Sequence, residues 1–290
     1  MKSLNNLGIQ GLAFVELSTS KPDALADLLG QLGFAQTMSH GIREIDLFQQ
    51  NQINILLNRE PGSHADGFQC EFGAGVASLG WIVEDPERAL TLAMKRGAEP
   101  VPGDYVTLDG DLAPCIQGIG ESLHYFIQKP KDLNLFENIE FETFGSSTQS
   151  SQSVGLNSIR SLCFQCSPPD FATTVNFFRR ILDFQTDETT SSQGNTLEIP
   201  GGLKIEVQPF TAQLNALSAE GGTIHLFKGL SKIALSVTER NEVLNRFENN
   251  PDLNQLIDWQ RSRTGQDSGP TVLRLQPAKP LGALSVEITL

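Results

Sequence analysis

Two cysteines three residues apart, Cys163 and Cys166, form a C-x-x-C pair, a spacing that can hold a metal ion or a redox-active disulfide. The residues around them, however, are typical of a β-strand, and a spacing of three places two side chains on opposite faces of a strand. Four cysteines in 290 residues are also too few for a disulfide framework. We therefore interpret Cys163 and Cys166 as core thiols.

The strand that carries these cysteines opens a longer pattern, the stretch 159–184. It predicts a strand, a turn and an amphipathic helix whose apolar positions recur at helical spacing: Phe171, Val175, Phe178 and Leu182. The stretch 11–34 has the same layout 150 residues earlier, with Ser20 as the expected N-cap, Pro22 in the first turn and Gly33 at the helix end. No gap is needed to match the two stretches. The chain is therefore expected to contain two related units.

The remaining elements follow the same order in both halves. In the first half, apolar runs predict strands at 44–49, 52–57, 77–83 and 123–127, a loop at 58–75 and a helix from Asp85 to Gly97. In the second half, 203–207, 231–237 and 284–288 match 53–57, 77–83 and 123–127. A Ser- and Gln-rich run between the halves is typical of a flexible linker. We expect two domains, 1–144 and 156–290, joined by a linker at 145–155.

The charge of the chain limits its partners. A formal net charge of −13 and a pI near 4.7 argue against nucleic acid or an anionic membrane, since either would need a basic patch. The N-terminal residues lack the apolar core of a signal peptide, and about 18 consecutive apolar residues, as a membrane span needs, occur nowhere. We therefore expect a soluble cytoplasmic protein, with a small-molecule acid or a second copy of the chain left open as partners.

Several strings in this pattern carry a family resemblance. The first half, with GLAFVEL, INILLNREPGSHA and IGESLHYFI, resembles the N-terminal domain of the 4-hydroxyphenylpyruvate dioxygenases, within the vicinal oxygen chelate superfamily. The second half, with NFFRRILDF, GLSKIALSV and LSVEI, is similar to the catalytic C-terminal domain of that family. The resemblance implies an α+β fold in which tandem βαβββ modules form two curled, mixed-sheet half-barrel domains.

The resemblance also implies an activity and a metal site. Members of the family bind Fe(II) through two histidines and a glutamate, chelate an α-keto acid on the iron, and use O₂ to decarboxylate it and hydroxylate its ring. In this chain the two histidine positions hold Ser161 and Lys232, and only Glu287 keeps the type of its ligand. A hydroxyl group is a poor ligand for Fe(II), and a protonated amine has no lone pair to give. In the first half the matching positions are Gly11, Ser78 and Phe126, which predict no metal site either.

The expected pocket therefore contains Ser161, Cys163, Gln208, Lys232 and Glu287. Lys232 and Glu287 either form an ion pair in place of the metal, or Lys232 binds the carboxylate of a small acid or acts in catalysis. Gln208 either bonds a polar ligand or ends its strand. His225 is the one histidine that could reach this pocket as a substitute ligand, and an exposed loop histidine is its simpler interpretation.

We expect a dioxygenase-like protein with a degenerate Fe(II) site and no metal cofactor, which binds a small aromatic or keto acid rather than oxidising it. Whether the chain is an enzyme stays open. One alternative is an active Fe(II)-dependent dioxygenase, or another enzyme of the superfamily, with relocated ligands such as His225 or Cys163. Another is a module that sequesters small molecules in an apolar, aromatic-lined cleft.

Overall fold

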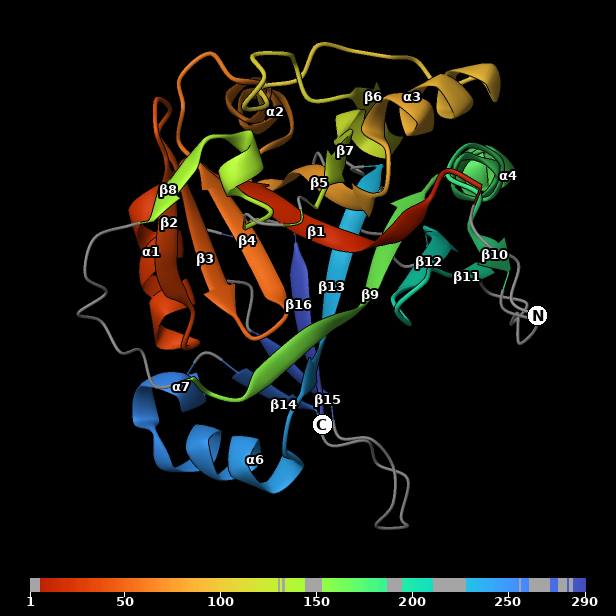
Figure 1. Cartoon of the computed structure of the whole chain (residues 1–290). Helices are drawn as coiled ribbons and strands as arrows, with labels where there is room; N and C mark the ends of the chain where they lie inside the picture. Colours follow the sequence, from red (N-terminus) through yellow and green to blue (C-terminus); the bar gives the residue numbers. More distant parts are fainter. Residues whose placement is uncertain are drawn as a thin grey trace.

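The computed structural model describes residues 6–129, 131, 134–143, 153–186, 195–210, 228–255, 257–260, 272–275, 281 and 284–290. These residues form two eight-stranded mixed sheets with helices against them (Figure 1). The strands of the first sheet are β1 (Ile9–Ser18), β2 (Ala35–His40), β3 (Ile45–Gln50), β4 (Ile53–Asn58), β5 (Gly75–Val83), β6 (Cys115–Gln117), β7 (Leu123–Gln128) and β8 (Phe141–Thr143). The strands of the second sheet are β9 (Leu156–Cys166), β10 (Gln185–Thr186), β11 (Asn195–Glu198), β12 (Lys204–Pro209), β13 (Gly229–Val237), β14 (Ile257–Gln260), β15 (Val272–Leu275) and β16 (Ser285–Thr289).

The helices follow the strands of each half along the chain. The α-helices are α1 (Pro22–Gln31), α2 (His64–Phe72), α3 (Pro86–Lys95), α4 (Phe171–Asn176), α6 (Arg240–Asn249) and α7 (Pro251–Gln255). A π-helical turn, η4 (Phe177–Ile181), continues α4, and short 3₁₀ turns are η1 (Ile119–Glu121), η2 (Glu137–Ile139) and η3 (Pro168–Asp170). No helix among the described residues is long and apolar enough to cross a membrane.

The two sheets repeat one strand order. The first sheet runs β6-β7-β5-β1-β4-β3-β2, and the second runs β15-β16-β13-β9-β12-β11-β10, with β8 and β14 added at opposite ends. Strand directions agree as well, because β1–β4 and β9–β12 are parallel while β1–β5 and β9–β13 are antiparallel. Each sheet consists of two modules in which a strand and its helices precede further strands, such as β1-α1-β2-β3-β4. The α+β fold of tandem βαβββ modules is confirmed, and both sheets are open rather than closed barrels.

Local sequence signals succeeded where apolar periodicity was strong. Helix α3 begins after Asp85, whose side chain accepts a hydrogen bond from the Arg88 amide at 2.9 Å. The predicted loop at 58–75 is wrong, since α2 lies within it and is capped by Ser63, which accepts from the Asp66 amide at 3.1 Å. Ser20 is not the N-cap of α1. Lys21 holds that position without a side-chain cap, and Thr19 bonds the Lys21 amide instead.

The gapless match between the two halves is also wrong. In the first sheet, Glu16 of β1 pairs with Leu56 of β4 and Ser78 of β5. In the second sheet, Cys163 of β9 pairs with Glu206 of β12 and Lys232 of β13, the matching strands. Glu16 and Cys163 therefore hold equivalent positions. Both strand–helix units then exit through a residue with positive φ, Gly33 at 82° and Asp183 at 60°. Gly33 follows Glu16 by 17 positions, whereas Asp183 follows Cys163 by 20. The second unit therefore has three extra residues, in the segment that contains the π-helical turn η4.

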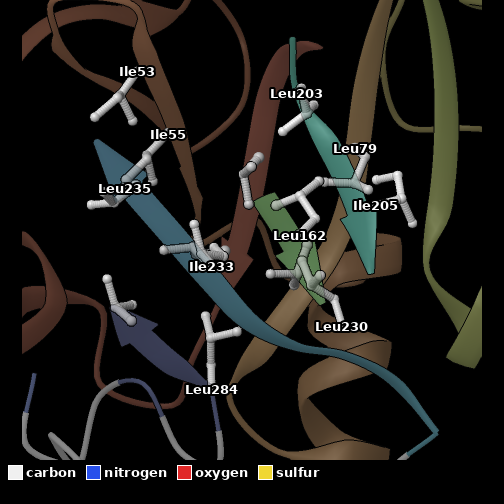
Figure 2. Close-up of a cluster of buried hydrophobic side chains, with 14 of the residues drawn as sticks. Ile53, Ile55, Leu79, Leu162, Leu203, Ile205, Leu230, Ile233, Leu235 and Leu284 are labelled. Atoms are coloured by element: carbon white, nitrogen blue, oxygen red, sulfur yellow. The ribbon is translucent and has the colours of Figure 1, made fainter. Parts of the chain in front are cut away.

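One apolar core joins the two halves. It takes side chains from β1, α1 and β4 of the first half and from β9, β13 and β16 of the second. Figure 2 shows part of this core, to which β4 contributes Ile53 and Ile55 and β13 contributes Ile233 and Leu235. A separate cluster, with Phe14, Tyr105 and Tyr125 among its aromatic members, fills the other face of the first sheet. The expected linker lies mostly outside the described residues, and the division into domains stays a prediction.

Candidate functional site

The second sheet separates apolar from polar side chains by strand alternation. On β9, Leu162, Phe164 and Cys166 belong to the core between the sheets. Because side chains alternate along a strand, Ser161 and Cys163 lie on the opposite face. We call this face, which also carries Glu206, Lys232 and Glu287, the polar face. Cys163 and Cys166 therefore lie on opposite faces, as their spacing predicts, and both are buried free thiols.

The register of the ladders brings four of the predicted pocket residues together on this face. In one row across the sheet, Ala234 of β13 pairs with Ser161 on one side and with Glu287 on the other. In the next row, Lys232 pairs with Cys163. The positions that the family resemblance assigns to metal ligands are thus neighbours on three adjacent strands.

Ion pairs cross these rows. The Lys232 ammonium nitrogen lies 3.2 Å from Glu287 Oε2 and 3.9 Å from Glu206 Oε2. The other oxygen of Glu287 accepts a hydrogen bond from Arg274 Nε at 2.8 Å. The Glu287 side chain is 11% exposed, so its charge is largely removed from water. Each oxygen of Glu287 therefore faces one cation, Lys232 or Arg274. Glu287 is the one expected ligand position that still holds the residue type of the family.

Glu206 and Arg274 complete this network, and the sequence did not single them out. Glu206 alternates with the core residues Ile205 and Val207 on β12, so its polar-face position follows from strand periodicity. Arg274 lies on β15, a four-residue strand whose pairing with β16 no local sequence signal specifies. Gln208 donates to Glu206 Oε2 at 3.4 Å, which places it at the margin of the network.

The charges fix the protonation of the central groups. Burial acts to lower the pKa of the Lys232 ammonium, but the carboxylates of Glu287 and Glu206 outweigh it, and the pKa is raised above its ordinary value. Burial raises the pKa of the Cys163 thiol to about 11, against the opposing effect of Lys232. At neutral pH the site therefore presents an ammonium group and a neutral thiol, and neither is a nucleophile.

These residues do not fit Fe(II). A metal ion at this position would need lone pairs from at least three side chains, and both oxygens of Glu287 already face cations. Among the described residues, no group of three or more His, Cys, Asp or Glu side chains could hold a metal ion. His225 lies outside the described residues, so its place relative to the polar face stays a prediction.

The equivalent positions of the first half are filled by packed side chains. The ladder register aligns Ser161 with Phe14, Lys232 with Ser78, and Glu287 with Tyr125. The predicted match of Lys232 with Ser78 is therefore confirmed. The predicted matches of Ser161 with Gly11 and of Glu287 with Phe126 are wrong. The rings of Phe14 and Tyr125 lie 6.2 Å apart between centroids.

Glu16 lies at the centre of this filled region. It is 1% exposed and accepts hydrogen bonds from Tyr105 at 2.6 Å, Asn58 at 2.8 Å and the Ser78 hydroxyl. Burial raises the pKa of Glu16 despite these hydrogen bonds. The one sign of this cluster in the sequence is a single polar residue, Glu16, in an apolar strand.

The first-half histidines are structural. His124 is fully buried, accepts a hydrogen bond from the Trp81 indole at 2.9 Å, and has a pKa lowered by burial to about 3. His40 Nδ1 accepts from the Ile42 amide at 3.2 Å. His64 Nε2 lies 2.9 Å from the Glu121 carbonyl oxygen. None of these histidines belongs to the polar face.

Comparisons with known proteins agree with this architecture. Residues 4–142 match a family model described as hydroxyphenylpyruvate dioxygenase, HPPD, N-terminal. A 4-hydroxyphenylpyruvate dioxygenase of Pseudomonas aeruginosa is 31% identical over 186 residues, which cover 62% of this chain and 51% of that protein. The enzyme of the same name from Legionella pneumophila strain Corby is 24% identical over 99% of this chain and 86% of its own length.

A solved structure extends the likeness to nearly the whole fold. A fusion protein of a xylose isomerase-like TIM barrel and 4-hydroxyphenylpyruvate dioxygenase superposes with a TM-score of 0.72 at 19% identity. The superposition covers 97% of this chain and 49% of the fusion protein. The chain also spans about half the length of several curated relatives that it matches.

Proposed function

Because this chain is a 4-hydroxyphenylpyruvate dioxygenase-like protein with the vicinal oxygen chelate fold, we propose that it binds a small aromatic or keto acid without oxidising it. The proposal has two parts. An ion-pair network takes the place of the metal on the polar face, and the ammonium group of Lys232 provides the charge that an acidic ligand needs.

The observation that carries the proposal is that each carboxylate oxygen of Glu287 pairs with a different cation. Its Oε2 faces Lys232 at 3.2 Å and its Oε1 accepts from Arg274 at 2.8 Å. An ammonium group repels a divalent cation and cannot coordinate one. A partly buried carboxylate that is paired on both oxygens would lose both pairs if a metal displaced them. The network therefore supports the loss of iron-dependent chemistry at this site.

The weaker arm of the network is the place where an acid would bind. The Lys232 ammonium nitrogen lies 3.9 Å from Glu206 Oε2, which is longer than a hydrogen bond. The side chains of Lys232 and Glu206 are 25% and 28% exposed. A ligand carboxylate could approach the ammonium group on this side while Glu287 stays in place. The raised pKa of Lys232 keeps it protonated at neutral pH, which favours anion binding over Schiff-base chemistry.

Two measurements on the full chain test the two parts. The first is metal analysis of the purified protein, followed by oxygen uptake with Fe(II) and 4-hydroxyphenylpyruvate; the expected results are no stoichiometric iron and no uptake above the protein-free control. Stoichiometric metal with turnover that survives Lys232→Met but not His225→Ala would instead support relocated ligands.

The second measurement is calorimetric titration with 4-hydroxyphenylpyruvate. Lys232→Met keeps the aliphatic stem and removes the charge, and should weaken binding at least about tenfold, as expected for the loss of a hydrogen bond to a charged group. Lys228→Met is the matched control, because Lys228 faces Asp170 at 3.6 Å and not the network. Equal losses in both variants would show a general charge effect and would reject the Lys232 site.

A further inference from the structure

Strand β13, which carries Lys232, has one residue more than its partner β9 in the middle of their ladder. Leu230 pairs with Phe164 of β9. Two residues later, Lys232 pairs with Cys163, which is adjacent to Phe164, so Ser231 lies between these pairs as an extra residue. One extra residue in one strand of an antiparallel pair is a β-bulge. Two residues of β13, Ser231 and Lys232, therefore lie opposite Cys163.

The bulge determines which side chains of β13 enter the core. Leu230 and Ile233 are 4% and 5% exposed, and Figure 2 shows both among the buried side chains between the sheets. Side chains three positions apart point to opposite faces of a regular strand, so both can be buried only because of the extra residue. The Ser231 hydroxyl donates to the Cys163 carbonyl oxygen at 3.1 Å, which ties the bulge to β9. Lys232, next to Ile233, is left on the polar face.

The first sheet repeats this bulge at the equivalent place. Val76 and Ser78 of β5 pair with adjacent residues of β1, so Ala77 is the extra residue. Ser78, the equivalent of Lys232, donates a hydrogen bond to the buried carboxylate of Glu16. In each half, the residue that follows the extra one therefore presents its polar group to a glutamate.

A turn of the first half contacts the chain just before the bulge of β13. Gly120 of η1 has a φ of 67°, and a Cβ atom at this position would collide with the Lys228 carbonyl oxygen and with Gly229. The next residue, Glu121, also has a positive φ of 60°, and its carbonyl oxygen lies 2.9 Å from His64 Nε2 of α2. The start of β13 therefore packs against a turn that is itself held by α2.

We propose that the bulge of β13 and the η1 turn position the Lys232 ammonium group for the acid ligand, so that Ser231 and Gly120 are positioning residues of the acid site. This inference rests on the proposed function. Bulges bend a strand and redirect its side chains, and η1 fixes the chain from which this bulge starts. The first half thereby sets the geometry of a site whose charged side chains belong to the second half.

Deletion of Ser231 tests the bulge, because Leu230, Lys232 and Ile233 would then alternate as in a regular strand and could keep their pairing. Loss of the bulge changes the twist of β13 at Lys232. It should weaken the binding of 4-hydroxyphenylpyruvate at least about tenfold in a calorimetric titration, as Lys232→Met does. Deletion of Ala77 removes the equivalent bulge of the first sheet and is the matched control, with the affinity expected to stay at that of the wild type.

Gly120→Ala tests the turn, and Gly110→Ala is its matched control. Both glycines have positive φ, 67° and 84°, so an alanine is strained at either position. A Cβ atom at Gly110 has nothing within 4 Å, whereas one at Gly120 meets the Lys228 carbonyl oxygen of the second half. Gly120→Ala should therefore weaken binding of the acid by about 2- to 30-fold relative to Gly110→Ala.

The NMR signal of the Lys232 ε-methylene group gives a readout that needs no ligand. In protein with labelled lysine, it is the signal missing from Lys232→Met. It should move on deletion of Ser231 and in Gly120→Ala, and stay in place on deletion of Ala77 and in Gly110→Ala. A bulge and a turn that only support the fold would change the unfolding midpoint without moving this signal.

The outcomes separate this inference from the function on which it rests. Wild-type affinity in both the Ser231 deletion and Gly120→Ala, or a Lys232 signal that stays in place in both, would reject the positioning and leave the acid site standing. A wild type that does not bind 4-hydroxyphenylpyruvate would reject the acid site, and the lysine signal would then decide whether the bulge and the turn position Lys232. If the Ser231 deletion does not fold, Gly120→Ala decides by both readouts.

Discussion

At the scale of single residues, the candidate site depends on Glu287. Its carboxylate is mostly buried, and both of its oxygens face cations, Lys232 at 3.2 Å and Arg274 at 2.8 Å. Removing its charge leaves two positive groups near each other, with Glu206 as the remaining acid. The cost therefore includes repulsion between the cations as well as the lost ion pairs.

We predict that Glu287→Gln lowers the free energy of unfolding by about 1–3 kcal/mol, less than for a fully buried pair because Lys232 and Arg274 are partly exposed. Urea denaturation at pH 7 measures the change. Glu242→Gln removes the exposed partner of Arg246 in α6 and should cost no more than about 0.5 kcal/mol. Equal effects of the two substitutions would contradict a network centred on Glu287.

Glu16 gives a prediction for pH. Burial raises its pKa above the ordinary value of 4.5, so the folded chain holds this proton more tightly than the unfolded chain. The stability that Glu16 contributes is then full below pH 4.5 and falls as the pH rises through the raised pKa. Glu16→Gln removes this dependence, because the amide does not titrate.

The measurement is the difference in free energy of unfolding between wild type and Glu16→Gln, taken from pH 4 to pH 8. We expect the wild type to lose stability relative to Glu16→Gln as the pH rises. The difference should change by at most about 1.4 kcal/mol per pH unit. A flat difference would show that the three hydrogen bonds to Glu16 offset its burial.

At the site, the sequence could predict individual positions but not their partners. Lys232 and Glu287 were found because the family pattern marks their strands. Arg274 was missed because its role depends on the pairing of β15 with β16, a contact that no local signal specifies. Glu16 was missed because one glutamate in an apolar strand does not reveal the Asn58, Ser78 and Tyr105 donors around it.

At the scale of elements, a Ser residue near the start of a helix is not enough to predict the N-cap. Ser63 accepts from the Asp66 amide and caps α2, whereas Ser20 is exposed and does not cap α1. We predict that Ser63→Ala lowers the free energy of unfolding by about 1 kcal/mol. Ser20→Ala should change it by less than about 0.5 kcal/mol. Thermal or urea unfolding of both variants measures the two changes. An equal loss of unfolding free energy in both variants would show that Ser20 also caps its helix.

The elements that sequence reasoning missed were short or polar. Strand β2 and helix α2 lie in segments with few periodic apolar residues, and α2 buries little more than Ala65 and Phe68. Helices α1 and α3 and the central strands were predicted because apolar positions at a fixed spacing mark the face that each of them buries. The gapless match failed because the second unit has three extra residues, which only the register of the ladders reveals.

At the scale of the whole molecule, the shared core determines how the chain unfolds. Leu235 of the second half and Ile55 of the first belong to one apolar cluster that draws side chains from both halves. We predict a single cooperative unfolding transition with equal midpoints by circular dichroism and by tryptophan fluorescence. Leu235→Ala should lower the free energy of unfolding by about 2–5 kcal/mol and shift both midpoints together. Two separate transitions, or a shift in only one probe, would show that the halves unfold independently.

The three extra residues of the second strand–helix unit bear on how such a duplicated protein diverges. A slip of one residue in a strand would exchange its apolar and polar faces, so insertions in the ladders are removed by selection. A helix can absorb added residues as a wider turn, and η4 is a π-helical turn in the lengthened segment. Length changes between the duplicated copies therefore accumulate in the helices, while the strands that carry the chemistry of the site keep their register.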